Sequence, residues 1–199
     1  MNEKIETVIF DVGGVLIDFC WERYCMELGF SEDVIRTFHD QMICSEIWDF
    51  LDEGTIRTEN AIQEFEQRMP QYAKEVRRFW QHPEFFVEEY GYAGDLIRSV
   101  KEKGYAVYLL SNYPYDMYKM HWPKFSFYSM VDGYVVSAEE KLRKPDPAIY
   151  HLILERYHLV PDTCLFIDDR KNNTDAAIRV GMNAVQFTDA ESVRKLLAL

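Results

Sequence analysis

Short apolar runs alternate with amphipathic segments along much of the chain. The runs consist almost wholly of apolar residues and are bounded by turn or charged residues, which is typical of parallel strands covered on both faces. The segments between them have the spacing of amphipathic helices. This alternation predicts a doubly wound α/β core. The predicted strands are 7–10, 106–110, 164–167 and 184–187, with 134–136 as a further candidate, and the predicted helices are 93–103, 146–158 and 173–181.

Residues 19–90 break this alternation. They carry long helical patterns, few strand candidates, and helix-start signals at 31–33 and 58–60. Pro83 and Gly91 mark the return to the core pattern. The sequence therefore predicts a helical insertion placed directly after the first strand. The predicted division is a core of residues 1–18 and 91–199 with an insertion of residues 19–90.

The charge balance argues against polyanionic partners. The 199 residues include 22 basic and 34 acidic side chains, which gives a net charge of −12. Binding to nucleic acid or to an anionic membrane would act against this overall field, so we predict neither as a partner. An anionic substrate would need local positive charge from a metal, a lysine or helix amides. Apolar runs also stay well short of the length of about 18 residues that a membrane span requires.

The cysteines indicate a reducing environment. Cys20, Cys25, Cys44 and Cys164 form neither a C-x-x-C pair nor a metal-finger spacing. The first ten residues, "MNEKIETVIF", lack the pattern of a signal peptide. We therefore expect a cytoplasmic protein, present as a monomer or a weak homodimer.

Three carboxylates stand where predicted strands end. Asp11 follows the first strand, and Asp168 and Asp169 follow the strand at 164–167. Taken singly, Asp is also a common turn residue. Because ligands of open α/β sheets bind beyond the carboxyl ends of the strands, we expect the three to share one edge. Adjacent carboxylates repel one another, and a hard divalent cation such as Mg²⁺ relieves that repulsion.

A hydroxyl, an amide and an ammonium group complete the expected site. Ser111 and Asn112 end the strand at 106–110, and Lys144 lies in "RKPDP". Each alone could be a turn residue or a solvated charge. Together they can hold phosphate oxygens. The set predicts a phosphoryl-transfer site in which Asp11 is the nucleophile, Lys144 assists catalysis, and an aspartyl-phosphate is the intermediate.

Three further residues flank these groups. Arg143 and Arg170 are candidates for added positive charge at the mouth of the site, although arginine is usually solvated. Asn173 either orients the loop that carries the two adjacent acids or caps the helix that follows.

Four motifs occur in order: "DVGGV", "LLSN", "RKPDPAIY" and "FIDDRKNNTDAAIRVGM". In this order and spacing the chain resembles the haloacid dehalogenase superfamily over its whole length. The resemblance implies a Rossmann-like core, a helical cap after the first strand, Mg²⁺, and an Asp nucleophile. It further implies that the metal is held by Asp11, the backbone carbonyl of Gly13, Asp168 and Asp169, and the phosphate by Ser111 and Lys144.

One position departs from the superfamily pattern. Most of its phosphatases carry a second Asp two residues after the nucleophile, as general acid and base, and here that residue is Gly13. The "DVGGV" start is similar to the branch that contains α-D-glucose-1-phosphate phosphatase, which implies that phosphatase activity can survive the change. Asp18, seven residues beyond the nucleophile, is a candidate for a replacement base.

The leading interpretation is a Mg²⁺-dependent phosphatase that hydrolyses a small phosphorylated metabolite, such as a sugar phosphate, through an aspartyl-phosphate on Asp11. A 2-haloacid dehalogenase is the first alternative, because those enzymes also lack the second Asp and use their nucleophile against carbon without Mg²⁺. A catalytically weak binding protein that keeps the fold is the second. The pair Asp168 and Asp169 favours phosphate chemistry.

Overall fold

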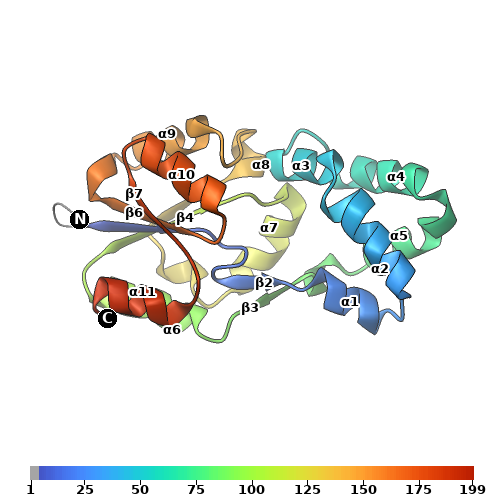
Figure 1. Ribbon diagram of the computed structural model, residues 1–199, viewed down its shortest axis with the longest axis horizontal. Coiled ribbons are helices and arrows are strands. Elements are labelled where there is room, and N and C mark those ends of the chain that lie inside the picture. The colour runs from blue at the N-terminus through green and yellow to red at the C-terminus, as the bar shows by residue number, and fades with distance from the viewer. Residues whose placement is uncertain (1–4) are drawn as a thin grey trace.

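A five-stranded parallel sheet forms the centre of the computed structural model, which describes residues 5–199. The strand order is β5-β4-β1-β6-β7, so the chain builds outward from β1 on one side and then on the other (Figure 1). The predicted α/β fold with a parallel sheet is therefore confirmed. The strands are β1 Thr7–Phe10, β4 Ala106–Ser111, β5 Gly133–Val136, β6 Cys164–Asp168 and β7 Asn183–Gln186.

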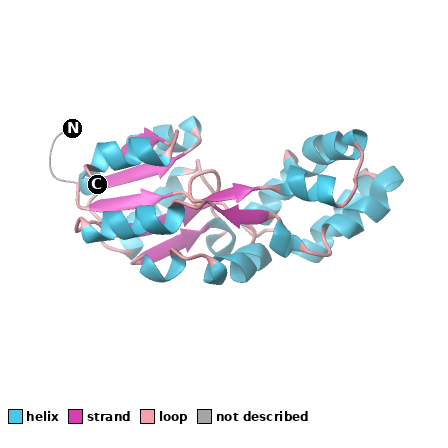
Figure 2. Ribbon diagram, turned by 90° about the horizontal axis from the view of Figure 1, so that it is seen from below, coloured by secondary structure: helices cyan, strands magenta, loops and turns pink. Residues whose placement is uncertain are grey.

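Helices cover both faces of this sheet (Figure 2). Val8 and Phe10 of β1 are buried in one hydrophobic cluster with α6 and α11, whereas Ile9 is buried in a second cluster with α9 and α10. Burial on both faces explains why β1 is buried at every position and why its last three residues are apolar. The core helices are α6 Ala93–Glu102, α7 Tyr115–His121, α8 Ser137–Glu140, α9 Pro147–Arg156, α10 Lys171–Arg179 and α11 Ala190–Leu197.

The segment between the first core strand and α6 forms a group of helices at one end of the molecule (Figure 1). Five α-helices and a π-helical turn at His39–Ile43 make up most of it. Within residues 5–199, no helix is long and apolar enough to span a membrane. The helices are α1 Trp21–Glu27, α2 Glu32–Phe38, α3 Glu46–Glu53, α4 Thr58–Arg68 and α5 Ala73–Phe79.

A two-stranded antiparallel ribbon joins these helices to the core. Strand β2, Ile17–Phe19, pairs with β3, Val87–Glu89. The sequence did not predict this ribbon, because strands of three residues are too short to show a periodic pattern. Strand β2 crosses the domain boundary predicted after residue 18, and the division into residues 1–18 with 91–199 and residues 19–90 stays a prediction.

Candidate active site

Three carboxylates meet at the carboxyl edge of the sheet. Asp11 directly follows β1, Asp168 ends β6, and β1 and β6 are neighbouring parallel strands. One carboxylate oxygen from each of Asp11, Asp168 and Asp169 lies within 4.8 Å of the other two. The sheet order reverses at β1, which is where open α/β sheets bind their ligands. The structure thus brings together the three acids that the sequence singled out.

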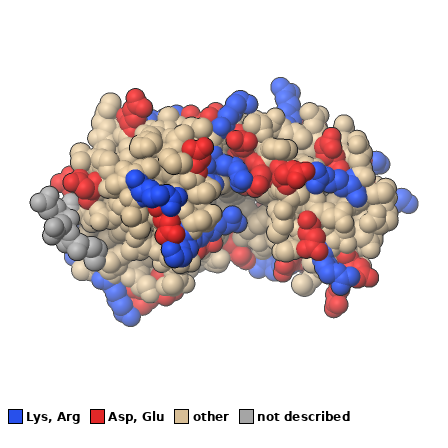
Figure 3. Space-filling model, turned by 45° about the horizontal axis from the view of Figure 1, so that its top comes forward, with Lys and Arg blue, Asp and Glu red and all other residues tan. Residues whose placement is uncertain are grey.

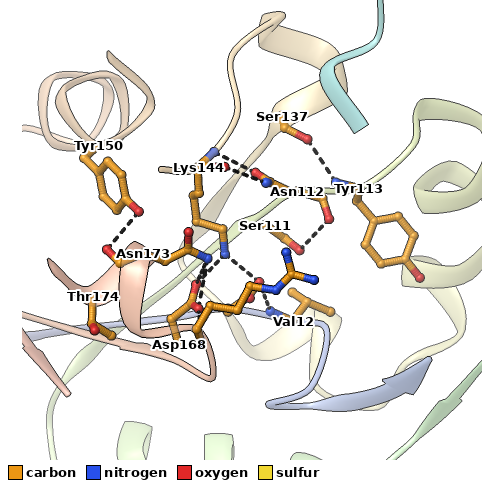
Figure 4. A network of polar contacts seen from close by, with 12 residues as sticks. Val12, Ser111, Asn112, Tyr113, Ser137, Lys144, Tyr150, Asp168, Asn173 and Thr174 are labelled. Atoms are coloured by element: carbon orange, nitrogen blue, oxygen red, sulfur yellow. Dashed lines mark hydrogen bonds and ion pairs between the residues drawn. The ribbon is translucent and has the colours of Figure 1, made fainter. Parts of the chain in front are cut away.

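Lys144 lies buried between two of these acids (Figure 4). Its Nζ is 2.8 Å from Oδ1 of Asp11 and 2.7 Å from Oδ2 of Asp168, and its side chain is 1% exposed. Burial by itself lowers the pKa of Lys144, but the charges of Asp11 and Asp168 outweigh burial and raise it. Lys144 therefore stays protonated at the site, and the carboxylates of Asp11 and Asp168 compensate its charge.

Hydrogen bonds fix the Asp168 carboxylate on every side. It accepts from the backbone N–H of Arg170 at 2.8 Å and from Nδ2 of Asn173 at 3.0 Å, in addition to Lys144 (Figure 4). Burial raises the pKa of Asp168, yet Lys144 and these hydrogen bonds hold it below its usual value. The Asn173 side chain donates to both Asp168 oxygens and so orients the acidic loop. This is the first of the two roles predicted for Asn173.

Asp11 and Asp169 keep unpaired oxygens. Oδ1 of Asp11 accepts from Lys144 and from the N–H of Val12 at 2.7 Å. Across residues 5–199, no side chain donates a hydrogen bond to Oδ2 of Asp11 or to either carboxylate oxygen of Asp169. Burial chiefly raises the pKa of Asp11 to about 7, with Lys144 opposing the shift, and burial and then Asp168 raise the pKa of Asp169.

This donor set fits a hard divalent cation. Unpaired oxygens of Asp11 and Asp169 stand in a cluster with Asp168, and such oxygens are the ligands that Mg²⁺ prefers. Gly13 lines the same cavity, and within the described chain its carbonyl oxygen accepts no hydrogen bond. The predicted metal ligands are therefore placed compatibly with their assigned roles, which stay predictions.

Gly14 makes room for Asp169. Its φ of +71° lies in the left-handed region, and a Cβ at this position would lie 2.7 Å from Oδ2 of Asp169. Gly13, by contrast, would place a Cβ in open space, with nothing within 4 Å. The second glycine of "DVGGV" is therefore required by the backbone and by the neighbouring acid.

We expect Gly14→Ala to lower the free energy of unfolding by about 1–2 kcal/mol, because a left-handed conformation costs a residue with a Cβ that much. Urea unfolding of the purified protein measures the loss. Gly13→Ala is the matched control, and its unfolding free energy should stay within about 0.5 kcal/mol of the parent. Equal losses in the two variants would contradict the special role of Gly14.

Asn112 and Ser111 lie at the end of β4, beside the lysine loop (Figure 4). Nδ2 of Asn112 donates to the carbonyl of Lys144 at 3.0 Å, and its Oδ1 accepts from the Lys144 N–H at 2.8 Å. Asn112 thus positions the Lys144 backbone, a role that the sequence did not predict. The Ser111 hydroxyl is almost fully buried and donates a long hydrogen bond of 3.4 Å to the carbonyl of Asn112. Phosphate binding by both residues stays a prediction.

A cavity of about 490 Å³ opens between these core residues, the ribbon and α3. Figure 3 shows acidic and basic side chains gathered near the middle of the molecule, where its two parts meet. Sequence reasoning missed the cavity residues contributed by the helical insertion, because no motif marks them. They are Ile43, Cys44, Asp49 and Asp52, which line the cavity together with Trp48.

The two flanking arginines both reach this cavity. Arg143 forms a two-pronged ion pair with Asp49 of α3, with N–O distances of 2.7 and 2.8 Å. Its charge therefore links the core to the insertion. Arg170 also lines the cavity, as its neighbour Asp169 does.

The family model for haloacid dehalogenase-like hydrolases matches residues 5–181. The chain belongs to this family. The predicted superfamily and the predicted enzyme class, a hydrolase, are thereby confirmed.

Relatives of this haloacid dehalogenase-like hydrolase include named phosphatases. The sesquiterpene phosphatase astK of Aspergillus oryzae is 26% identical over 194 residues, which cover 96% of this chain and 93% of the relative. The D-ribitol-5-phosphate phosphatase of Bacteroides thetaiotaomicron is 26% identical over 212 residues, and the match covers 98% of each chain.

Solved structures of the family share the fold. The magnesium complex of a HAD family enzyme from Bacteroides thetaiotaomicron is similar with a TM-score of 0.77 and 23% identity, covering 99% of this chain and 100% of that one. A dehalogenase with an intermediate complex also matches, with a TM-score of 0.77 and 18% identity, covering 100% of both chains. These similarities establish the fold and leave the reaction to the residues of the site.

Proposed function

We propose that this enzyme hydrolyses a small phosphorylated metabolite, with Mg²⁺ as cofactor and an aspartyl-phosphate on Asp11 as intermediate. The observation that carries the proposal is the cluster of three carboxylates, two of them paired with the buried Lys144, with unpaired oxygens on Asp11 and Asp169. The phosphatase names of two relatives that match nearly the whole chain support it.

Asp11, Asp168, Asp169 and the carbonyl of Gly13 would hold the metal ion. When bound, Mg²⁺ supplies positive charge that stabilises the transferring phosphoryl group. The phosphate group of a monoester carries up to two negative charges, so a site rich in carboxylates can accept it only with such added positive charge. Lys144 contributes a second, permanent positive charge from the protein itself.

Asp11 has the geometry of an activated nucleophile. Lys144 and the N–H of Val12 orient the carboxylate through Oδ1, so that one of its two oxygens can attack phosphorus while the other would hold the metal ion. Attack forms a bond between a carboxylate oxygen of Asp11 and phosphorus and breaks the bond from phosphorus to the leaving oxygen. Hydrolysis of the resulting aspartyl-phosphate by water then releases inorganic phosphate and restores Asp11.

Dehalogenation of a 2-haloacid by Asp11 is the competing reaction. The intact Asp169, whose carboxylate is unpaired and stands within the acidic cluster, favours phosphate chemistry, since a reaction at carbon needs no metal. The retained Asp11 and Lys144 likewise argue against a silent binding protein.

A substrate panel with Mg²⁺ and with EDTA tests the proposal. The panel contains sugar phosphates, an isoprenyl monophosphate, para-nitrophenyl phosphate and a 2-haloacid. We expect phosphate release from at least one monoester with Mg²⁺, a fall of roughly 10²-fold or more with EDTA, and recovery when Mg²⁺ is restored. Halide release that persists in EDTA, without phosphate release, would establish the dehalogenase alternative.

A further inference from the structure

Because Gly13 has no side chain, proton transfer at this site needs a group from another residue. Monoester hydrolysis needs a proton for the leaving oxygen and a base for the attacking water, and a positioned side chain accelerates such transfers. Gly13 has no side chain to do this, and a Cβ built on it would meet nothing within 4 Å. The cavity beside Asp11 is therefore open at this point, and the group that moves the proton must come from another wall.

Asp52 stands on that other wall. It lies in the last turn of α3 and lines the same cavity as Asp11, Gly13 and Lys144. Because a cavity of about 490 Å³ is suited to one small ligand, the groups that line it can face the same bound molecule.

Contacts with the core hold the end of α3 in place. The Ser137 hydroxyl donates to the backbone carbonyl of Asp52, and Nζ of Lys141 donates to the carbonyl of Gly54 at 3.0 Å. The ion pair of Asp49 with Arg143 fixes the preceding turn of the helix. The Asp52 carboxyl group is free of these contacts, since only its backbone takes part in them.

Asp52 has no partner that would explain it as a structural residue. Within residues 5–199, its carboxylate forms neither an ion pair nor a hydrogen bond. It also stands near the carboxyl end of a helix, where the helix dipole disfavours a negative charge. A half-buried acid that lines a cavity and has an unfavourable interaction with the dipole of its own helix is typical of a functional group.

The groups around Asp52 belong to the expected phosphate side of the cavity. Burial first and then the charge of Asp49 raise the pKa of Asp52 to about 7, whereas Arg143, Arg170 and Lys144 lower it. Tyr113, which follows β4, is a further titratable neighbour: burial and then Asp52 raise its pKa. A carboxyl group with a pKa near neutrality can both give and take a proton.

We propose that Asp52 is the general acid and base of this enzyme, in place of the carboxyl group that Gly13 lacks. The proposal rests on the proposed phosphatase function. In the first step a carboxylate oxygen of Asp11 bonds to phosphorus, the bond to the leaving oxygen breaks, and Asp52 gives its proton to that oxygen. In the second step Asp52 takes a proton from water as the water oxygen bonds to phosphorus, and the bond to Asp11 breaks. The proton returns to Asp52, and Asp11 is restored.

Asp18 is the competing candidate, because it also lines the cavity. It lies on strand β2 of the ribbon, near Tyr90, whose pKa is raised by burial and then by the charge of Asp18. Asp52 instead stands among Arg143, Arg170 and Lys144, the cations that a phosphate group would approach. The charges of the cavity therefore favour Asp52.

Asp52→Asn and Asp18→Asn form the matched pair of variants. Para-nitrophenyl phosphate has a good leaving group, whereas the alkyl phosphate turned over fastest in the panel has a poor one. We expect Asp52→Asn to lower kcat/KM for the alkyl phosphate by about 10²–10⁴-fold and to lower kcat/KM for the aryl phosphate much less, because only the alkoxide needs a proton. The proposal would be overturned if Asp18→Asn lost activity chiefly on the alkyl phosphate while Asp52→Asn kept the parental kcat/KM on both substrates.

The pH profile gives a second readout. In the parent enzyme kcat/KM for the alkyl phosphate should fall as pH rises through about 7, because Asp52 loses the proton that it must donate. Asp52→Asn should lose this basic limb. A profile that keeps the limb, with equal losses on both substrates, would indicate a purely structural effect and would overturn the proposal.

A rescue variant separates chemistry from folding. Gly13 has room for a side chain, so Gly13→Asp in the Asp52→Asn background should recover at least tenfold in kcat/KM for the alkyl phosphate. A larger gain from Gly13→Asp in the Asp52→Asn background than in the parent background supports a proton-transfer role for Asp52. Equal gains in the two backgrounds, or no recovery in a protein with parental thermal unfolding, count against the proposal. If the parent enzyme releases phosphate from no monoester of the panel, the proposed function itself fails.

Discussion

Asp11→Asn should lose roughly 10⁴-fold or more in kcat while the protein keeps its fold. An amide has nearly the shape of the carboxylate but is a very poor nucleophile, so the first covalent step is lost. Lys144 would keep its contact with Asp168 at 2.7 Å, and the buried cation therefore remains paired. We expect the free energy of unfolding to change by no more than about 1–2 kcal/mol.

Steady-state kinetics and acid quenching together measure this effect. The parent enzyme, mixed with a radiolabelled phosphate monoester and quenched in acid, should carry label on the protein, whereas Asp11→Asn should carry none. Asp95→Asn is the matched control, because its side chain is 70% exposed on α6, away from the cavity. A folded Asp11→Asn variant that retains most of its phosphatase activity would end the covalent mechanism.

Lys144→Met should have the largest effect on stability. Removing one partner of a buried ion pair leaves uncompensated charge, which typically costs about 3–5 kcal/mol. Here the side chain is 1% exposed, and its loss would leave Asp11 and Asp168 beside each other without a cation. Activity should fall with stability, because Lys144 also supplies fixed positive charge for the phosphoryl group.

Urea unfolding with and without Mg²⁺ tests this prediction. Because a bound cation would replace part of the missing charge, Mg²⁺ should recover more stability in Lys144→Met than in the parent. Lys171→Met provides the control: that lysine is 73% exposed, its ion pair with Asp175 is on the surface, and the expected change is below about 0.5 kcal/mol. Similar losses in the two variants would mean that the Lys144 pairs contribute little.

The core of the site could be predicted from the sequence because parallel strands impose a simple rule. Each buried strand is a short apolar run, and the residues that follow it emerge at the same edge of the sheet. Asp11, Asp168 and Asp169 are therefore identifiable as neighbours although Asp11 lies far from the other two along the chain, because β1 and β6 are adjacent parallel strands. Lys144 could be assigned to the same site because it lies in the motif "RKPDP" and because its positive charge complements the three acids.

Contacts between side chains and distant backbone were not predictable in the same way. The Asn112 side chain forms two hydrogen bonds with the Lys144 backbone, 32 positions away, and neither local sequence predicts them. The ribbon of β2 and β3 could not be predicted either, because strands of three residues are too short to show a periodic pattern.

The sequence by itself determined the parallel core, the acidic edge and the absence of the usual acid at Gly13, because strand burial and motif order are local properties. Only the tertiary structure decided what faces that edge. Arg143 meets Asp49 across 94 positions, and Ser137 meets the Asp52 backbone across 85. Such contacts depend on how α3 packs against α8. No hydrophobic period or motif near Asp52 encodes its approach to the cavity, since the groups that define its surroundings lie on other elements of the fold.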